Sequence, residues 1–153
     1  MTDHALTLND FLPFRLSFTS NLVSDRIARA YQALFGLTIP EWRLVAVIAE
    51  GGGITQQAIG AKTRMDKVTV SRAAIALVDR SLVERAPNID DRRSHLLRLT
   101  GAGQALYEQV APKALELERR IFGGFDPERV TAFVAMLRDI DAVALAVEAE
   151  ATG

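Results

Sequence analysis

The stretch from Asp66 to Leu99 most constrains how this chain can fold. Its order of apolar and polar residues predicts a helix, a turn, one strand, a charged loop and a second strand. In the predicted helix, Val70, Ala74 and Leu77 recur at helical spacing, which gives the helix an inward-facing apolar side. The loop between the strands carries two acids followed by two arginines. The stretch is therefore interpreted as a helix followed by a β-hairpin wing.

The polar residues of this stretch favour contact with DNA. Lys67, Thr69, Ser71 and Arg72 lie near the start of the helix. Their hydroxyl and cationic groups suit phosphates and base edges, and the short side chain of Ala73 would let the backbone approach the major groove. An arginine at the hairpin tip can enter a minor groove while a neighbouring aspartate fixes its rotamer. An ordinary amphipathic helix with a solvated, charged hairpin is the alternative interpretation.

Composition narrows the class of protein. A length of 153 residues suits one domain, alone or with an oligomerisation element. The absence of cysteine excludes disulfides, thiolate zinc sites and cysteine nucleophiles, and His4 and His95 lack the spacing of metal ligands. No metal site and no cofactor is therefore predicted. The sequence has no run of about 18 apolar residues and no signal-peptide pattern, so a cytoplasmic location is expected.

Charge is unevenly distributed along the chain. The formal net charge is −1, yet residues 62–98 contain nine lysines and arginines against five acids, a local charge of +4. A basic centre flanked by acidic segments is typical of a protein that binds nucleic acid through one region. An asymmetry of this size also occurs in soluble proteins of other kinds.

The residues before this stretch predict further helices. A long helix should begin near Leu8 or Asn9, carry Pro13 in its first turn and end at Gly36. A second helix should begin after Thr38, and the glycines of 51–53 should end it. Thr55 and Asp66 are suited to cap two more helices. A short helix, a tight turn and a second helix make a helix-turn-helix.

The last third of the chain predicts two helices with long apolar stripes. Strands at 82–85 and 95–99 precede them, with Pro87 as the break between the strands. Thr100 should cap the first helix, Pro112 should kink or break it, and Asp126 should cap the second. A helix-turn-helix core does not need these helices, so burial of their apolar faces against a second copy predicts a homodimer. The alternative is that they cover the core of their own chain.

Over almost its whole length, the chain resembles the MarR family of bacterial transcription regulators. The resemblance rests on the ordered segments LTIPEWRLVAVI, MDKVTVSRAAIALVDRSLVER and DDRRSHLLRLTGAG. It implies a mainly α fold with a small β-hairpin wing, in one domain over residues 1–153. Residues 8–35 and 101–150 would be dimerisation helices, and residues 38–100 a winged helix-turn-helix DNA-binding lobe. Ser81 departs from the family pattern, because a glycine is common there.

The resemblance also implies a set of DNA contacts on a pseudo-palindromic operator. Arg72 corresponds to a DNA contact of the recognition helix, and Asp91 with Arg93 matches the pair at the wing tip. The predicted DNA-binding residues are Thr55, Arg64, Lys67, Thr69, Val70, Ser71, Arg72, Asp91, Arg92 and Arg93. Because Ala73 and Ala74 replace larger residues of the family, the individual groove contacts are left open.

Members of the family often respond to small phenolic or aromatic acids that lower their DNA affinity. The run FLPFRLSFTSNLVSDRIARAY followed by GLTIPEWR is similar to members tied to aromatic-acid or hydroxycinnamoyl catabolism. Arg15 could pair with a ligand carboxylate, with Phe18, Asn21 and Trp42 around the ring and Arg43 as a second cation. The alternative is that the aromatic residues belong to the core and that both arginines form structural ion pairs.

These observations predict a homodimeric repressor released from DNA by a small aromatic acid or its CoA thioester. One rival is a helical interaction module without DNA binding, against which the presence of Arg72 and Arg93 argues. The other is a small esterase or thioesterase, for which Ser94 would have to act with His95. Neighbouring residues on a strand point to opposite faces, so this pair cannot cooperate and no catalytic residue is predicted.

Overall fold

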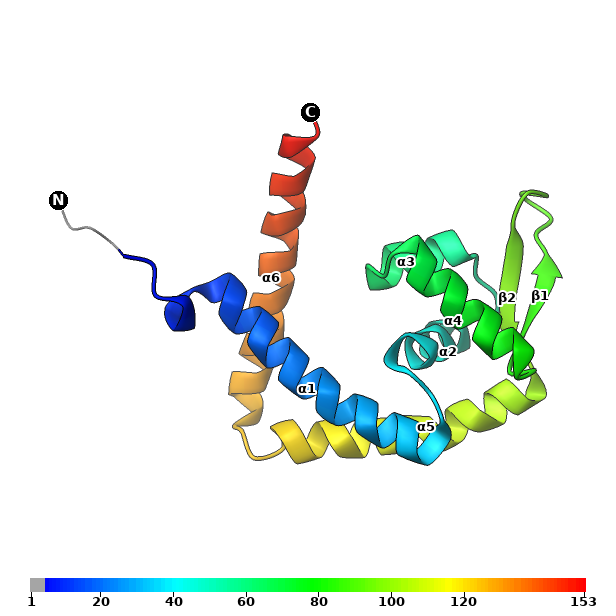
Figure 1. Ribbon diagram of the computed structural model, residues 1–153, viewed down its shortest axis with the longest axis horizontal. Helices are drawn as coiled ribbons and strands as arrows, with labels where there is room; N and C mark the ends of the chain where they lie inside the picture. Colours follow the sequence, from blue (N-terminus) through cyan, green and yellow to red (C-terminus); the bar gives the residue numbers. More distant parts are fainter. Residues whose placement is uncertain (1–4) are drawn as a thin grey trace. The chain divides into compact units, whose positions relative to one another are not determined.

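The structure, a computed structural model, describes residues 5–153 and is mainly helical with one two-stranded antiparallel hairpin (Figure 1). This is the predicted fold class. A short 3-10 turn at Leu8–Asp10 precedes the first helix. The elements are α1 (Leu12–Phe35), α2 (Ile39–Gly51), α3 (Gln56–Thr63), α4 (Lys67–Asp79), β1 (Val83–Pro87), β2 (His95–Leu99), α5 (Gly101–Phe122) and α6 (Pro127–Ala151).

The chain forms two compact units, one ending at Pro112 and the other beginning at Lys113. The first unit holds the hydrophobic core, to which α2, α3, α4 and the hairpin contribute (Figure 1). Its most completely buried large side chains are Leu37, Leu44, Ile48, Ile59, Leu77 and Leu97. The second unit contains the end of α5 and the whole of α6.

Four predicted helix caps of the first unit are confirmed. One of them is Thr100, whose Oγ1 accepts a hydrogen bond from the N–H of Gly103 at the start of α5, at 3.1 Å. Thr38 Oγ1 accepts a hydrogen bond from the backbone N–H of Glu41 at 3.3 Å, and Thr55 Oγ1 accepts one from Ala58 at 3.1 Å. Asp66 Oδ1 accepts from the N–H of Thr69 at 2.8 Å. Each cap satisfies one of the N–H groups that a helix start leaves without a partner. The caps therefore fix where α2, α3, α4 and α5 begin.

The prediction that the first helix begins at Leu8 or Asn9 is wrong. Phe11 is extended, with φ −78° and ψ 115°, and α1 begins at Leu12. The reason is Pro13, whose ring would collide with the carbonyl of Asn9 if the helix extended further toward the N-terminus. Proline fits best in the first turn of a helix, which is where α1 places it. Gly36, at φ +62°, ends the helix as predicted.

The break expected at Pro112 is also absent, because α5 is helical from Gly101 to Phe122. A proline inside a helix leaves the carbonyl four residues earlier without its partner. That carbonyl belongs to Glu108, and both Glu108 and Pro112 are exposed. Water can hydrogen-bond to a carbonyl on this side, so the helix continues through the proline.

The two strands of the wing pair in register from Val83 opposite Leu99 to Pro87 opposite His95. The sequence-based end of the first strand at residue 85 is therefore wrong. Proline is tolerated at the end of an edge strand, where its missing N–H removes no ladder bond. Ile54, just before α3, adds two backbone hydrogen bonds to Leu97, of 3.2 and 2.8 Å. These bonds attach the wing to the helix-turn-helix.

In the second unit, Asp126 caps α6 by accepting a hydrogen bond from the N–H of Glu128 at 3.0 Å. Pro127 occupies the first turn of α6, as predicted. None of the residues of α6 is buried. Within residues 5–153 no single helix is long and apolar enough to cross a membrane; only α1 and α2 together, with a 78° bend between them, meet the length and composition required.

Candidate nucleic-acid interface

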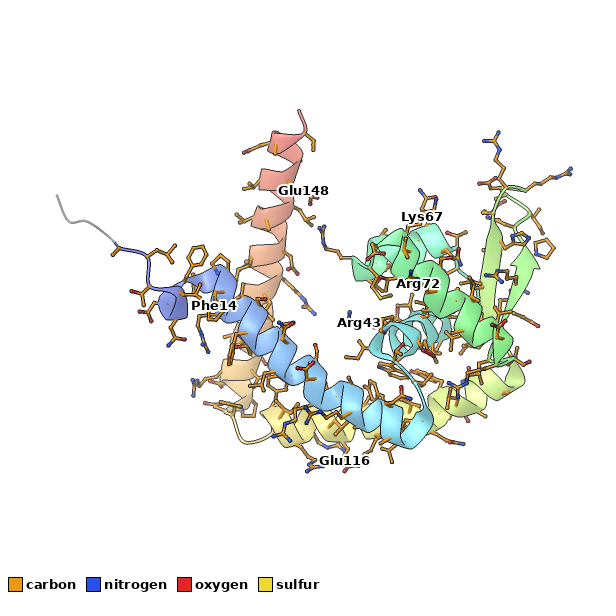
Figure 2. The ribbon with its side chains drawn as sticks, in the orientation of Figure 1. Phe14, Arg43, Lys67, Arg72, Glu116 and Glu148 are labelled. Carbon is orange, nitrogen blue, oxygen red and sulfur yellow. The ribbon has the colours of Figure 1, made fainter. Side chains whose placement is uncertain are left out.

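Helix α4 has one buried side and one exposed side. Its buried residues are Val70, Ala73, Ala74 and Leu77. Its exposed residues before the last turn are Lys67, Val68, Arg72 and Ile75, and Figure 2 shows Lys67 at the start of the helix and Arg72 further along it. Val68 and Ile75 are 56% and 49% exposed, which is unusual for apolar residues on a helix with its own core side. The exposed side of α4 is therefore both cationic and apolar.

Two residues predicted to face DNA belong instead to the core. Val70 is 2% exposed and Ala73 is 4% exposed. A base edge cannot reach a side chain with so little exposed surface, so neither residue is expected to contact a base, although Val70 still lines the groove described below. Val68, which the sequence analysis did not select, takes the exposed position two residues before Val70.

The cap of α4 also engages Thr69. Its hydroxyl donates to Asp66 Oδ2 at 2.9 Å, in addition to the backbone bond at the other carboxylate oxygen. Both hydrogen bonds favour the charged carboxylate and hold the pKa of Asp66 below its ordinary value. The hydroxyl proton of Thr69 is therefore already used within the protein, and Thr69 acts mainly as part of the cap.

A groove of about 750 Å³ lies between the start of α3, the start of α4 and the wing. Four basic side chains line it: Lys67, Arg85, Arg93 and His95. Asp91 is the one acidic residue among its lining residues. Thr55 also lines the groove, and its capping bond uses the oxygen as an acceptor, so the hydroxyl proton can still be donated. A concave surface on which basic side chains outnumber acidic ones suits a phosphate backbone.

The wing loop is ordered by its own polar side chains. Asp91 Oδ1 accepts from the backbone N–H of Arg93 at 3.0 Å, and Asn88 Nδ2 donates to Ser94 Oγ at 2.9 Å. The carboxylate of Asp91 thus holds the loop backbone, whereas the sequence analysis assigned it to the arginine rotamer. Arg92 and Arg93 are both exposed on this ordered loop. The loop can therefore present the two guanidinium groups from a fixed backbone.

Arg64 and Ser71 complete the predicted DNA contacts. Arg64 closes α3 in the left-handed conformation, at φ +56°, and its side chain is exposed. Ser71 is half-buried on α4. Arg85 and the two glutamines that open α3, Gln56 and Gln57, line the groove although the sequence analysis did not select them. The strand pattern does not identify Arg85, because Arg85 is exposed although it lies on the same face of the hairpin as the buried residues Val83 and Leu97.

The structure does not combine Ser94 and His95 into a hydrolytic site. Ser94 Oγ accepts from Asn88 and donates to the backbone oxygen of Asp91 at 3.3 Å. The hydroxyl is thus committed to the loop. Within the described residues, no group of three or more histidine or acidic side chains could hold a metal ion.

The predicted ligand residues fall into two separate groups. Arg15 lies 5.3 Å from the ring centre of Phe18 and donates to Asn9 Oδ1 at 3.1 Å. Trp42 instead packs against Tyr31, with ring centres 5.7 Å apart. Phe18 and Tyr31 are about 20 Å apart along α1, at 1.5 Å per residue. One aromatic acid therefore cannot contact both groups within a single chain.

The second group is an aromatic cluster that joins α1, α2 and α5. Trp42 stacks on Tyr107, with ring centres 6.0 Å apart and planes inclined by 14°. Tyr31 is buried, and this burial raises the pKa of its hydroxyl. Arg43, next to Trp42, is exposed on α2, and Asn21 is exposed on α1 (Figure 2 labels Arg43).

Apolar residues are exposed along both helices that were expected to dimerise. On α1 they include Leu12, Leu16, Phe18 and Leu22. On α6 they are Phe133, Val134, Met136, Ile140, Val143, Leu145 and Val147. Long stripes of exposed apolar residues are typical of surfaces that a partner covers.

Comparisons with known proteins agree with this architecture. A model of the MarR family matches residues 35–94. The chain is 28% identical over 134 residues to the multiple antibiotic resistance protein MarR of Salmonella typhimurium, an alignment that covers 86% of this chain and 93% of that relative.

Solved structures share the fold over most of the chain. A MarR/EmrR family transcriptional regulator from Acinetobacter sp. ADP1 gives a TM-score of 0.84 at 23% identity, covering 91% of this chain and 98% of that one. CouR from Rhodococcus jostii RHA1, solved bound to p-coumaroyl-CoA, gives 0.78 at 23% identity, covering 89% and 95%. At these identities the similarity establishes the fold.

Proposed function

We propose that this chain is a homodimeric repressor of the MarR type. Its release from a pseudo-palindromic operator would be triggered by a small aromatic acid or its CoA thioester. The MarR family model that matches residues 35–94 and the 28% identity to the MarR protein of Salmonella typhimurium support this proposal. Members of the family are transcription regulators and not enzymes, which sets the esterase alternative aside. The observation that carries the proposal is the exposed side of α4, which lies beside a cationic groove bounded by the wing.

Each side chain has a distinct role on DNA in this proposal. Residues 38–100 form the DNA-binding lobe, and α4 enters the major groove. Arg72 bonds to a base edge, and Val68 contacts the methyl group of a thymine. Lys67 and Arg85 neutralise phosphates of the backbone that crosses the groove. Arg92 and Arg93 reach the adjacent minor groove from the wing.

The apolar stripes of α1 and α6 support a homodimer. Burial of these exposed residues in a two-fold interface removes them from water, at about 25 cal/mol per Å². Two recognition helices about 34 Å apart would read half-sites one helical turn apart. An effector acts by binding more tightly to a dimer whose helices have another spacing, so that it shifts the population away from the DNA-binding state.

The effector class rests on Arg15, which lies over the ring of Phe18, and on Arg43, which follows Trp42 in the sequence. Arg15 with Phe18 and Asn21 forms one candidate contact group, and Arg43 with Trp42 forms the other. CouR, which shares the fold, was solved with a p-coumaroyl thioester of CoA. A guanidinium bonds well to a carboxylate or a phosphate, and an aromatic surface accommodates the ring.

A titration of the protein against fluorescent DNA from its own upstream region tests the proposal. Anisotropy is measured at two salt concentrations, with and without aromatic acids and their CoA thioesters. Binding that is selective, weakened by salt and reversed by one compound supports the repressor. Substitution of Arg72 and Arg93 together by alanine should abolish selective binding while the dimer stays folded. Unchanged affinity in that variant would favour the interaction module.

The two effector groups are separated by single variants. Arg15→Ala and Arg43→Ala are each titrated with the active compound while the protein is bound to DNA. Loss of release in only one variant assigns the effector to that arginine's group. If both variants respond like the wild type, these residues are not the effector site, although the DNA-binding proposal stands.

A further inference from the structure

A single side chain joins the end of α1 to the end of α4. Arg80, directly after α4, donates from Nη1 to the backbone oxygen of Gly36 at 3.0 Å and from Nη2 to that of Phe35 at 3.3 Å. We propose that Arg80 is a positioning residue, which sets the orientation of the recognition helix relative to α1 and thereby the operator spacing that the dimer accepts. The proposal rests on the function proposed above.

The two oxygens are a natural target for a guanidinium. The last carbonyls of a helix have no helical partner and carry the negative end of the helix dipole. Gly36 turns the chain at φ +62°, a conformation that glycine adopts readily. The guanidinium is a planar fork that can donate to two oxygens at once, so it fixes an angle as well as a distance. A lysine ammonium can satisfy one oxygen but does not fix this plane.

The link is rigid at its other end as well. The backbone N–H of Arg80 donates to the oxygen of Ala76 at 3.2 Å, so the residue is still bonded to the last turn of α4. Within the part of the chain that the structure describes, no other side-chain hydrogen bond or ion pair joins α1 to α4. A change in the direction of α1 can therefore reach α4 directly through Arg80, in addition to the packing of α2 against both helices.

Arg80 does not line the groove beside the wing. Both Nη1 and Nη2 of Arg80 already donate to carbonyl oxygens at the end of α1, so its effect on DNA binding is expected to come from geometry and not from a phosphate contact. In a dimer held together partly by α1, a fixed angle between α1 and α4 gives a narrow range of distances between the two recognition helices. Without Arg80 that range broadens, and the preference for one operator spacing weakens.

The first test uses DNA with the natural half-site spacing and with one base pair inserted or deleted. Arg80→Met removes both hydrogen bonds, and Arg80→Lys keeps the charge. Arg29→Met is the matched control, since Arg29 is exposed on α1 and its side chain has no hydrogen bond or ion pair within residues 5–153. In Arg80→Met, affinity for the natural spacing should fall about 5-fold, the scale of exposed charge-assisted hydrogen bonds. Affinity for unrelated DNA and the salt dependence should not change.

The result for Arg80→Lys should lie between those for Arg80→Met and the wild type, and Arg29→Met should match the wild type. A uniform loss of affinity for all DNA, with the slope against salt reduced by about one, would make Arg80 a phosphate contact and overturn the proposal. An unchanged preference among the three spacings in Arg80→Met would overturn it as well.

A second measurement needs no DNA. The chain has no cysteine, so a label on Ile75→Cys, an exposed position of α4, is unique in each protomer. Pulsed electron spin resonance then gives the distribution of distances between the two recognition helices of the dimer. The distribution should broaden in Arg80→Met and less so in Arg80→Lys, whereas an unchanged width refutes the role of Arg80. If the wild type bound no DNA selectively, the proposed function would fail, while this measurement would still decide the positioning role.

Discussion

Substitution of Gly103 tests how closely α5 packs against the start of the wing. It lies in the first turn of α5, and a Cβ atom there would overlap the backbone oxygen of Leu82 and lie 3.3 Å from Cδ2 of Leu99. The same oxygen of Leu82 accepts the N–H of Thr100 at 3.1 Å. The close approach of α5 to the start of β1 therefore requires a residue without a side chain.

The magnitude follows from two opposing effects of Gly103→Ala. In an unobstructed helix the change stabilises by about 0.5–1 kcal/mol, because alanine loses less backbone entropy. Overpacking costs about 1–3 kcal/mol, and the upper end applies when the obstacle is backbone, which cannot change rotamer. The net effect should be a loss of about 2 kcal/mol, equivalent to a fall in Tm of about 4–8 °C for a chain of this size.

Gly101→Ala is the matched control, since nothing lies within 4 Å of a Cβ atom at Gly101 in the same helix turn. Thermal and urea unfolding are followed by circular dichroism at one fixed concentration, because association stabilises the folded state. The control should be as stable as the wild type or slightly more so. If the Gly103→Ala protein is as stable as the Gly101→Ala control, the close approach of α5 to the start of β1 does not require glycine at position 103. Its DNA affinity should also fall, because the wing must shift to make room.

Three further outcomes are expected. Ser81→Gly should raise the free energy of unfolding by about 0.5–1 kcal/mol, because serine is held at φ +58°, which favours glycine; an unchanged urea midpoint would contradict this. The lowered pKa of Asp66 means that its charged form contributes stability above the ordinary value of 3.8, and that this contribution is lost as pH falls through the lower folded value. Urea titrations should therefore show the wild type and Asp66→Asn converging in acid, and parallel curves would disprove the assignment. On DNA, Lys67→Ala should reduce the salt slope by about one for all sequences, whereas Arg72→Ala should relax the preference at one base pair, and the reverse pattern would exchange their roles.

Local chemistry made the starts of the helices predictable. Thr38, Thr55 and Asp66 each accept the N–H bond that their position indicated, because capping depends on residues no more than three positions away. The helix was predicted to begin well before Pro13, and Pro112 was predicted to kink or break its helix; the early start and the break are both absent. Pro13 excludes helix on its N-terminal side, whereas Pro112 leaves a carbonyl on an exposed side of α5. The effect of a proline thus depends on the surroundings of the carbonyl one turn back, which spacing alone does not give.

The candidate interface was only partly predictable for a related reason. The period of Val70, Ala74 and Leu77 predicted the buried side of α4, and this side is confirmed. The same helical period indicates that Val70 faces the core and is a poor candidate for a DNA contact. It places Val68 on the exposed side of α4, four residues before Arg72. By contrast, the bonds from Arg80 to Gly36 span 44 positions, and no local pattern indicates them. Long-range hydrogen bonds follow from how the helices pack.

The separation of the two effector groups bears on the kind of compound this protein could sense. Arg15 and Phe18 lie near the start of α1, whereas Trp42 packs beside Tyr31, about 20 Å further along the helix at 1.5 Å per residue. A helix does not shorten, so a single-ring acid can occupy only one group within a chain. A thioester of CoA is long enough to extend from an aromatic site toward a second cation. If both arginines bind the same effector within one chain, a thioester therefore fits this geometry better than the free acid.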